Sequence, residues 1–497
     1  MELERRRLEA REHQRKRQQG LGKPIISAEF KGRRFVAVGS HLRASPRWRT
    51  FQDFLLDYGR DVLGKDWWVA ECSRPPSDRH PVVVWFELLQ RANGPTTDES
   101  GNPISRLMTG AAAAYLRLAY DLYCLEHNAL VRDRLVQRLK NQDNFPGALY
   151  EVLVAAVFTR GGFEIEFENE DDSTTSHVEF TARFKQTGRK FSVEAKRCEG
   201  QKRIGRRLYS ALVKEAAHPR IVFIDLNEPH EGPAGTEMPG FMKEALKHAR
   251  NYERGQGRDL PSAYVFMTNQ PYPHHLDGTA FKCSFIGEGF HIPDFKWDAQ
   301  FPGVRAAVEA RNAHTEMDQL AKSMAEHAEI PVTFDGEAPE LAFGEHPARL
   351  REGDRYLLHD DTGNAVSGTL MSATVMEKER CAYGILASDD GRRNMVTVPL
   401  SDAELAAYRR HPDTFFGTVE LGGKQISNAV EAFDFVFSAY RNTPREKLLE
   451  FMATAGAPDM DRLSMLSREE LARTYAERMA ASMVAGIPSA KSRSGGT

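Results

Sequence analysis

The sequence predicts a mixed α/β (α+β) protein built around an αβββαβ core of two helices and four strands. Three observations predict this fold class. Apolar residues wrap around a helical segment at 146–160, and apolar and polar residues then alternate in three short runs between 163 and 196. A second helical pattern, about 201–217, precedes the apolar run 220–225. Short runs broken by turn signals over 350–400 predict a small antiparallel β-domain.

Length and composition describe a multidomain globular chain. Its 497 residues are too many for one compact core, and 41% of them are hydrophobic and 28% charged. The net charge of −3 means that a nucleic-acid partner would have to be held by local basic patches. The five cysteines form no CxxC pair, and no segment resembles a signal peptide or membrane span. We therefore expect a cytoplasmic protein with reduced thiols and no membrane partner.

Shifts in composition divide the chain into five expected parts. The first is a charged arm with more Arg and Lys than Glu, which is expected to be solvated or to contact nucleic acid. The last part ends in a Ser- and Gly-rich tail. The expected parts are a charged arm, 1–20; an N-terminal α+β domain, 21–135; the domain with the αβββαβ core, 136–330; a small β-rich domain, 345–440; and C-terminal helices with a disordered tail, 441–497.

Outside the core, turn and cap signals predict the main elements. A strand is expected at 33–40, a helix at 48–64 that ends at a glycine, and a long helical stretch at 105–142 with a break near Asn128. Three capping boxes predict later helix starts. They pair Ser401 with Glu404, Thr443 with Glu446, and Ser467 with Glu470.

Within the core, Glu151 lies inside the apolar run of the first helix. A buried carboxylate costs several kcal/mol unless a cation or a hydrogen-bond donor meets it. Two interpretations stay open for Glu151. Either it has a functional partner, or it lies on the one polar edge of the helix.

The strands place further charged residues together. Val178, Phe180 and their alternating partners face one way, so Glu179 and His177 face the other. On the next strand Phe191, Val193 and Ala195 are expected to face the core, with Ser192, Glu194 and Lys196 on an opposite, polar face. Glu194 and Lys196 can therefore serve one site, although an ExK pair on an exposed strand is more often part of a solvated charge ladder.

These residue types suit phosphodiester cleavage. The reaction needs a hard divalent ion with oxygen ligands and a polarised water. Glu179 and Glu194 can bind Mg²⁺, and Lys196 can orient the attacking water and offset developing charge. Glu151 can complete the ligand shell through water.

A helix Glu, an acidic residue on the second strand and (D/E)xK on the third resemble the PD-(D/E)XK nuclease superfamily, which includes restriction endonucleases and Holliday-junction resolvases. The resemblance covers residues of about 145–230. It implies a restriction-endonuclease-like domain that hydrolyses DNA, or less often RNA, with Mg²⁺ or Mn²⁺. Glu151, Glu179, Glu194 and Lys196 would be catalytic, and Glu151, Glu179, Glu194 and His177 would be metal ligands. The family usually has Asp on the second strand, where this chain has Glu179 or His177.

Basic residues after the third strand suggest how nucleic acid would be held. Lys202, Arg203, Arg206 and Arg207 either contact a phosphate backbone or form a solvated helix face. We expect a bacterial nuclease that acts on DNA in genome defence or DNA processing. The flanking domains could bind a second copy of the chain or another protein, and the sequence leaves this open. The alternative is an inactive nuclease fold that acts as a nucleic-acid-binding or scaffold module.

Overall fold

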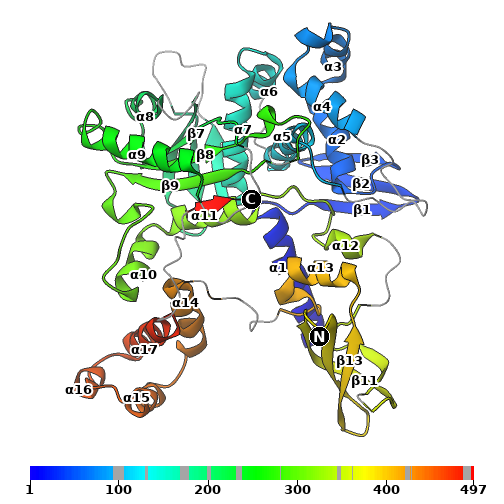
Figure 1. The fold of residues 1–497 in the computed structure, drawn as a ribbon, viewed down its shortest axis with the longest axis vertical. Coiled ribbons are helices and arrows are strands. Elements are labelled where there is room, and N and C mark those ends of the chain that lie inside the picture. The colour runs from blue at the N-terminus through cyan, green and yellow to red at the C-terminus, as the bar shows by residue number, and fades with distance from the viewer. Residues whose placement is uncertain are drawn as a thin grey trace.

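The computed structural model describes residues 1–92, 106–128, 133–167, 178–198, 203–230, 238–279, 281–343, 349–360, 362–419, 426, 428–484 and 494–496. Three β-sheets and the helices around them form a mixed α/β fold, which confirms the predicted class. Figure 1 shows the largest sheet in the upper body of the molecule, with a smaller β-unit and a group of helices below it.

The largest sheet has seven strands in the order β14-β9-β8-β7-β6-β5-β4. β4, β5 and β6 are joined as antiparallel neighbours, β6, β7 and β8 run parallel, and β9 turns back. The predicted succession of helix, three strands, helix and strand is present. Its elements are α7 (Phe145–Arg160), β4 (Phe163–Phe167), β5 (Phe180–Phe184), β6 (Lys190–Arg197), α8 (Ile204–Leu212) and β7 (Arg220–Asp225), followed by α9 (Gly240–Arg254), β8 (Ala263–Asn269) and β9 (Ser284–Phe290).

Helices cover both faces of this sheet. α7 packs on one face, whose core includes Val193 and Phe223, and α5 (Gly110–His127) packs on α7. α8 and α9 pack on the other face, whose core includes Val222 and Ile224. As a result both sides of β6 are buried from Phe191 to Ala195, so the expected polar face on this strand is wrong: α8 covers it.

A buried ion pair joins α7 and α5. Arg160 of α7 lies 2.6 Å from Asp121 of α5, and both side chains are almost fully buried. The Arg160 guanidinium also stacks over the Tyr120 ring. Burial raises the pKa of Asp121, and the Arg160 charge opposes this shift. The pair therefore fixes the helix that carries Glu151 to the rest of the core.

The N-terminal part of the chain forms a small sheet and helices next to the central body. The strand predicted at 33–40 and the helix predicted at 48–64 are confirmed, and the latter begins at a capping box of Thr50 and Asp53. The break near Asn128 is confirmed as the C-terminal cap of α5. The elements are β1 (Ile26–Phe30), β2 (Arg33–Val38), β3 (His41–Ser45), α2 (Phe51–Leu63), α3 (Lys65–Cys72), α4 (Pro81–Ala92) and α6 (Asp133–Lys140).

The predicted antiparallel β-unit is confirmed as a four-stranded sheet with its own apolar core. Its strands are β10 (Arg355–His359), β11 (Ala365–Met376), β12 (Cys381–Ala387) and β13 (Arg393–Pro399), followed by α13 (Asp402–Arg410). The charged arm forms α1 (Glu2–Gln19), and it is not solvated throughout. Arg7 pairs with Asp354, Arg17 pairs with Asp413, and Gln14 is buried. Figure 1 shows α1 between the central body and this sheet.

The observed starts of the C-terminal helices can be compared with the three predicted capping boxes. Those at Ser401 and Ser467 are confirmed, but the box at Thr443 is wrong because Pro444 is the N-cap and the helix begins at Arg445. Thr443 therefore lies one residue before the N-cap, so its hydroxyl is not in the position from which a capping box forms. The remaining helices are α10 (Val304–Ala313), α11 (Thr315–Glu326), α12 (Pro339–Ala342), α14 (Ala429–Tyr440), α15 (Arg445–Thr454), α16 (Met460–Leu463) and α17 (Arg468–Met483).

The predicted disordered tail contains a short strand, β14 (Ser494–Gly496). It pairs antiparallel with β9 at the edge of the largest sheet. An edge strand offers unpaired backbone groups that any extended segment can meet, so composition alone did not predict this pairing. All five cysteines are free, as predicted. Among the described residues, no helix combines the length and apolar character needed to cross a membrane.

Three buried histidines predict a pH dependence of stability. Burial lowers the pKa of His80, His327 and His411 from 6.5 to about 4, so the folded chain holds them neutral. The unfolded chain binds more protons between pH 6.5 and 4, and the free energy of unfolding should fall as the pH drops through that window. Each pKa unit corresponds to about 1.4 kcal/mol, so the sum should reach several kcal/mol.

Buried acids act in the opposite direction, and burial raises the pKa of Asp121, Glu194 and Asp225. Burial raises the pKa of Asp225 to about 7, so the folded chain gains a proton there over the same window. Denaturant unfolding at pH 7 and pH 5 compares the two contributions, and each buried histidine lowers the free energy of unfolding at pH 5 relative to pH 7. The variant His80→Phe, which keeps a ring against Phe145, should reduce the difference. If the free energy of unfolding changes equally between pH 7 and pH 5 in the wild type and in His80→Phe, His80 does not contribute to the pH dependence.

Candidate functional site

Glu179, Glu194 and Lys196 lie together on the face of the sheet that α8 covers. The Glu179 backbone N–H donates to the Val193 carbonyl at 3.0 Å, just before β5 pairs with β6, so Glu179 stands beside Glu194. The Lys196 ammonium forms an ion pair with Glu194 Oε1 and lies 3.7 Å from Glu179 Oε1. The period of two that predicts Glu194 and Lys196 on one face is therefore matched by the structure.

A second lysine, absent from the sequence-based prediction, completes this group. Lys214 Nζ lies 2.7 Å from Glu194 Oε1 and 3.8 Å from Glu179 Oε1. Lys214 follows α8, which ends at Leu212 instead of continuing to about 217 as predicted. The sequence offered one indication that Lys214 would lie at the site, and it came from the strand topology. A residue just before β7 lies near the start of both β6 and β7, because the two strands are parallel.

Burial dominates the electrostatics of Glu194. Only 2% of its side chain is exposed. Burial and the neighbouring Glu179 charge raise the pKa of Glu194, and the two lysines oppose this shift. Burial lowers the pKa of Lys196, but the Glu194 and Glu179 carboxylates outweigh it, so the pKa is raised and Lys196 stays protonated at neutral pH.

Glu194 has one oxygen available for a ligand. The shortest contact of each lysine is to Oε1, and Oε2 is buried and accepts no hydrogen bond from the part of the chain that the structure describes. Buried carboxylate oxygens normally have partners, and an unsatisfied one calls for an explanation such as an ion. Two carboxylates with an open oxygen fit a hard divalent cation such as Mg²⁺, with water as the remaining ligands.

The metal-binding set is smaller than the sequence predicts. Glu151 lies on α7, and Arg138 of α6 binds its two oxygens at 2.6 Å each. Its negative charge helps to raise the pKa of Lys196, so Glu151 lies within electrostatic reach of the site. Among the described residues, no three His, Cys, Asp or Glu side chains are arranged to hold one metal ion. His177 lies outside the described residues.

The predicted basic residues differ in position. Arg203 and Arg206 are exposed at the start of α8, and Tyr209 is exposed one turn further on. Arg207 is half-buried and lies near Cys198. Burial raises the pKa of the Cys198 thiol to about 11, and the Arg207 guanidinium opposes this shift. Lys202 lies outside the described residues.

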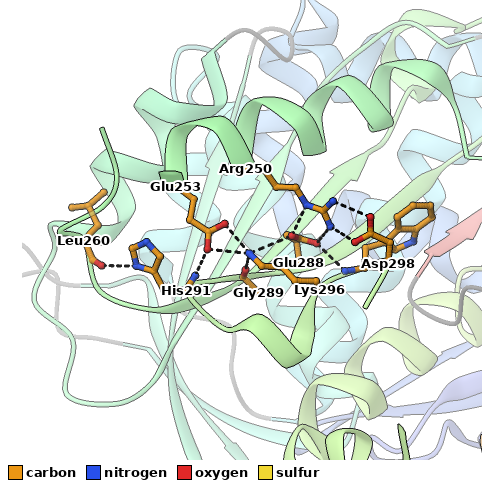
Figure 2. Close-up of polar contacts among 9 residues, drawn as sticks. Arg250, Glu253, Leu260, Glu288, Gly289, His291, Lys296 and Asp298 are labelled. Atoms are coloured by element: carbon orange, nitrogen blue, oxygen red, sulfur yellow. Dashed lines mark hydrogen bonds and ion pairs between the residues drawn. The ribbon is translucent and has the colours of Figure 1, made fainter. Parts of the chain in front are cut away.

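A second buried charge cluster lies on the same side of the sheet, between α9 and β9 (Figure 2). Glu288 is 3% exposed, and Arg250 donates to both of its oxygens at 2.8 and 3.1 Å. Arg250 also pairs with Asp298, and Lys296 pairs with Glu253 and Glu288. Each carboxylate of this cluster has a cationic partner. The cluster therefore fastens the segment after β9 to α9, and it offers no comparable open position for a ligand.

A scan against protein-family models matches no family, and searches of curated proteins and of solved structures return no match. The functional argument therefore depends on the chain's own side chains.

Proposed function

We propose that this chain is a metal-dependent nuclease of the PD-(D/E)XK type that hydrolyses phosphodiester bonds in nucleic acid, with DNA as the first candidate substrate. The observation that carries the proposal is the group formed by Glu179, Glu194 and Lys196 on two neighbouring strands. Glu194 is buried on a face of the sheet whose core is apolar, so packing alone does not require a carboxylate there. Such a group is costly for stability and is typical of functional sites.

The order and pairing of the elements support the same proposal. The helix with Glu151 precedes an antiparallel three-stranded unit, and the third strand runs parallel to β7 after a crossover through α8. The acidic residue on the second strand and the Glu-x-Lys of the third therefore lie next to each other in space. This is the arrangement that a restriction-endonuclease-like core would need.

Each side chain has a distinct task in this reaction. Glu179 and Glu194 would hold the Mg²⁺ or Mn²⁺ ion, and the Oε2 atom of Glu194 is open for it. When bound, the ion supplies a polarised water and neutralises phosphate charge. Lys196 remains a cation, so it can donate hydrogen bonds to the attacking water and to a phosphate oxygen as charge develops. Arg138 binds Glu151, and the Glu151 charge favours the protonated form of Lys196.

The exposed start of α8 supplies a surface for the substrate. Arg203 and Arg206 are exposed there, and guanidinium groups bind phosphate oxygens in a bidentate manner. These two residues would position the nucleic-acid backbone, whereas the half-buried Arg207 would contribute less.

The experiment that tests this function is cleavage of mixed single- and double-stranded DNA and RNA with Mg²⁺, and with EDTA as the metal-free reaction. The variant Glu194→Gln keeps the size of the side chain but removes its charge. It should weaken metal binding and lower cleavage by about tenfold or more, because one charged ligand is lost. The matched control is Glu164→Gln, which changes an exposed Glu of β4 and should leave both unchanged. Absence of metal-dependent cleavage in the wild type would reject the proposal.

A specific observation favours a second candidate, an inactive nuclease fold that binds nucleic acid or acts as a scaffold. Arg138 takes both oxygens of Glu151, which leaves two carboxylates at the site. This candidate predicts binding of nucleic acid without cleavage, equal with Mg²⁺ and with EDTA. Binding that depends on Arg203 and Arg206, without any cleavage, would establish it.

A further inference from the structure

Two lysines share one carboxylate oxygen at the candidate site, which is more positive charge than the proposed chemistry uses. Lys196 and Lys214 both pair with Glu194 Oε1, and both lie within 3.8 Å of Glu179 Oε1. We propose that Lys214 is a displaceable counter-ion, which neutralises the two carboxylates in the metal-free protein and withdraws when a divalent cation binds. The inference rests on the proposed function, since it concerns the same metal site.

Charge balance supplies the first reason. Two carboxylates and two ammonium groups leave the metal-free site neutral. A divalent cation added to all four would leave two excess positive charges in a site where Glu194 is 2% exposed. Repulsion between cations a few Å apart is strong where water is excluded. One lysine must therefore move away before the ion can bind tightly.

The positions of the two lysines indicate which one moves. Lys196 belongs to β6, and its backbone is paired with Ile224 of β7, so its side chain emerges from a fixed point. Lys214 follows the end of α8 at Val213, outside any helix or strand. Its neighbours Val213 and Glu215 are exposed, and its own side chain is 19% exposed. A change of rotamer is therefore enough to bring the Lys214 ammonium into water.

In this proposal Lys214 and Lys196 have different roles. Lys214 stabilises a buried acidic pair while no metal is present, since an uncompensated buried carboxylate is strongly destabilising. Lys196 stays in place and acts on the substrate. Lys214 thereby sets how tightly the site binds its metal, in the way that any competing cation lowers an apparent affinity.

The test measures metal binding and folding, not cleavage. Mn²⁺ and Mg²⁺ are titrated by calorimetry into the wild type, Lys214→Met and Lys214→Arg, and thermal unfolding is recorded with and without Mn²⁺. Lys214→Met should bind Mn²⁺ about tenfold or more tightly than the wild type, because one competing positive charge is removed. Its melting temperature should be lower without metal and should recover with Mn²⁺. Lys214→Arg keeps the charge and should bind Mn²⁺ much as the wild type does.

The control variant is Lys247→Met, which removes a lysine of α9 whose side chain is 66% exposed. It should change neither the Mn²⁺ affinity nor the melting temperature. Affinity in Lys214→Met that is unchanged or weaker would overturn the inference. If Glu194→Gln still abolishes binding in that case, the proposed metal site stands and only the role of Lys214 fails. If neither the wild type nor Lys214→Met binds Mn²⁺, the metal site and the inference fail together. Should Lys214→Met not fold, Lys214→Gln, which retains a polar group, provides the same comparison.

Discussion

Replacing Lys196 with alanine should lower metal-dependent cleavage by about 100-fold or more, as loss of one preorganised charge-stabilising donor does in other enzymes. The Lys196 ammonium is held between Glu194 and Glu179, where it can act on the attacking water and on developing phosphate charge. Folding should be largely retained, and metal binding should not be weakened, because no carboxylate is lost and one competing positive charge is removed. Lys214 remains 2.7 Å from Glu194 and still compensates the buried carboxylate.

The measurement is the cleavage rate at saturating Mg²⁺, together with a Mn²⁺ titration of the same protein. Lys190→Ala is the matched control, since Lys190 lies on the same strand but is exposed at its start. Cleavage that survives Lys196→Ala would show that the reaction occurs elsewhere on the chain. Loss of both metal binding and folded structure would instead show that Lys196 mainly holds the acidic pair together.

Replacing Asp121 with alanine should destabilise the core by about 3–5 kcal/mol, because it leaves the Arg160 guanidinium buried without its carboxylate. The side chains of Asp121 and Arg160 are 1% and 5% exposed and lie 2.6 Å apart. Arg117, 3.9 Å from Asp121, would lose a partner as well. Denaturant unfolding followed by circular dichroism measures the change.

An exposed pair of the same chemical type is the control for this change. Arg183 and Glu164 form an ion pair across β4 and β5, with 44% and 51% of their side chains exposed. Arg183→Ala should cost less than about 1 kcal/mol, since water screens exposed pairs. Similar losses for the two variants would show that burial does not distinguish these pairs.

The parts of the fold that follow a short period could be predicted from the sequence. Alternation over Phe163–Phe167 and Lys190–Arg197 gives the strands, and it also places Glu194 and Lys196 on one face. Ser401 and Ser467 give helix starts because their capping contacts are local. Each of these features depends on residues no more than a few positions apart.

The features that could not be predicted depend on contacts between distant segments. Glu194 is buried because α8 covers the face that alternation alone marks as polar. Lys214 reaches the site only because the helix ends early and the chain returns beside β6. Arg138 binds Glu151 across a helix–helix contact, so the sequence could not decide between the two interpretations of that carboxylate. In each case tertiary packing supplies the partner.

The contacts of α1 have a consequence for the order in which the chain can fold. Arg7 and Arg17 bind Asp354 and Asp413, residues that follow them by more than three hundred positions. A ribosome releases α1 before the segments with Asp354 and Asp413, so the acidic partners of α1 do not exist when that helix emerges. A segment of such low mean hydropathy gains little from folding alone. We therefore expect α1 to reach its native position only after the segments that carry Asp354 and Asp413 have been synthesised, although α1 is made before them.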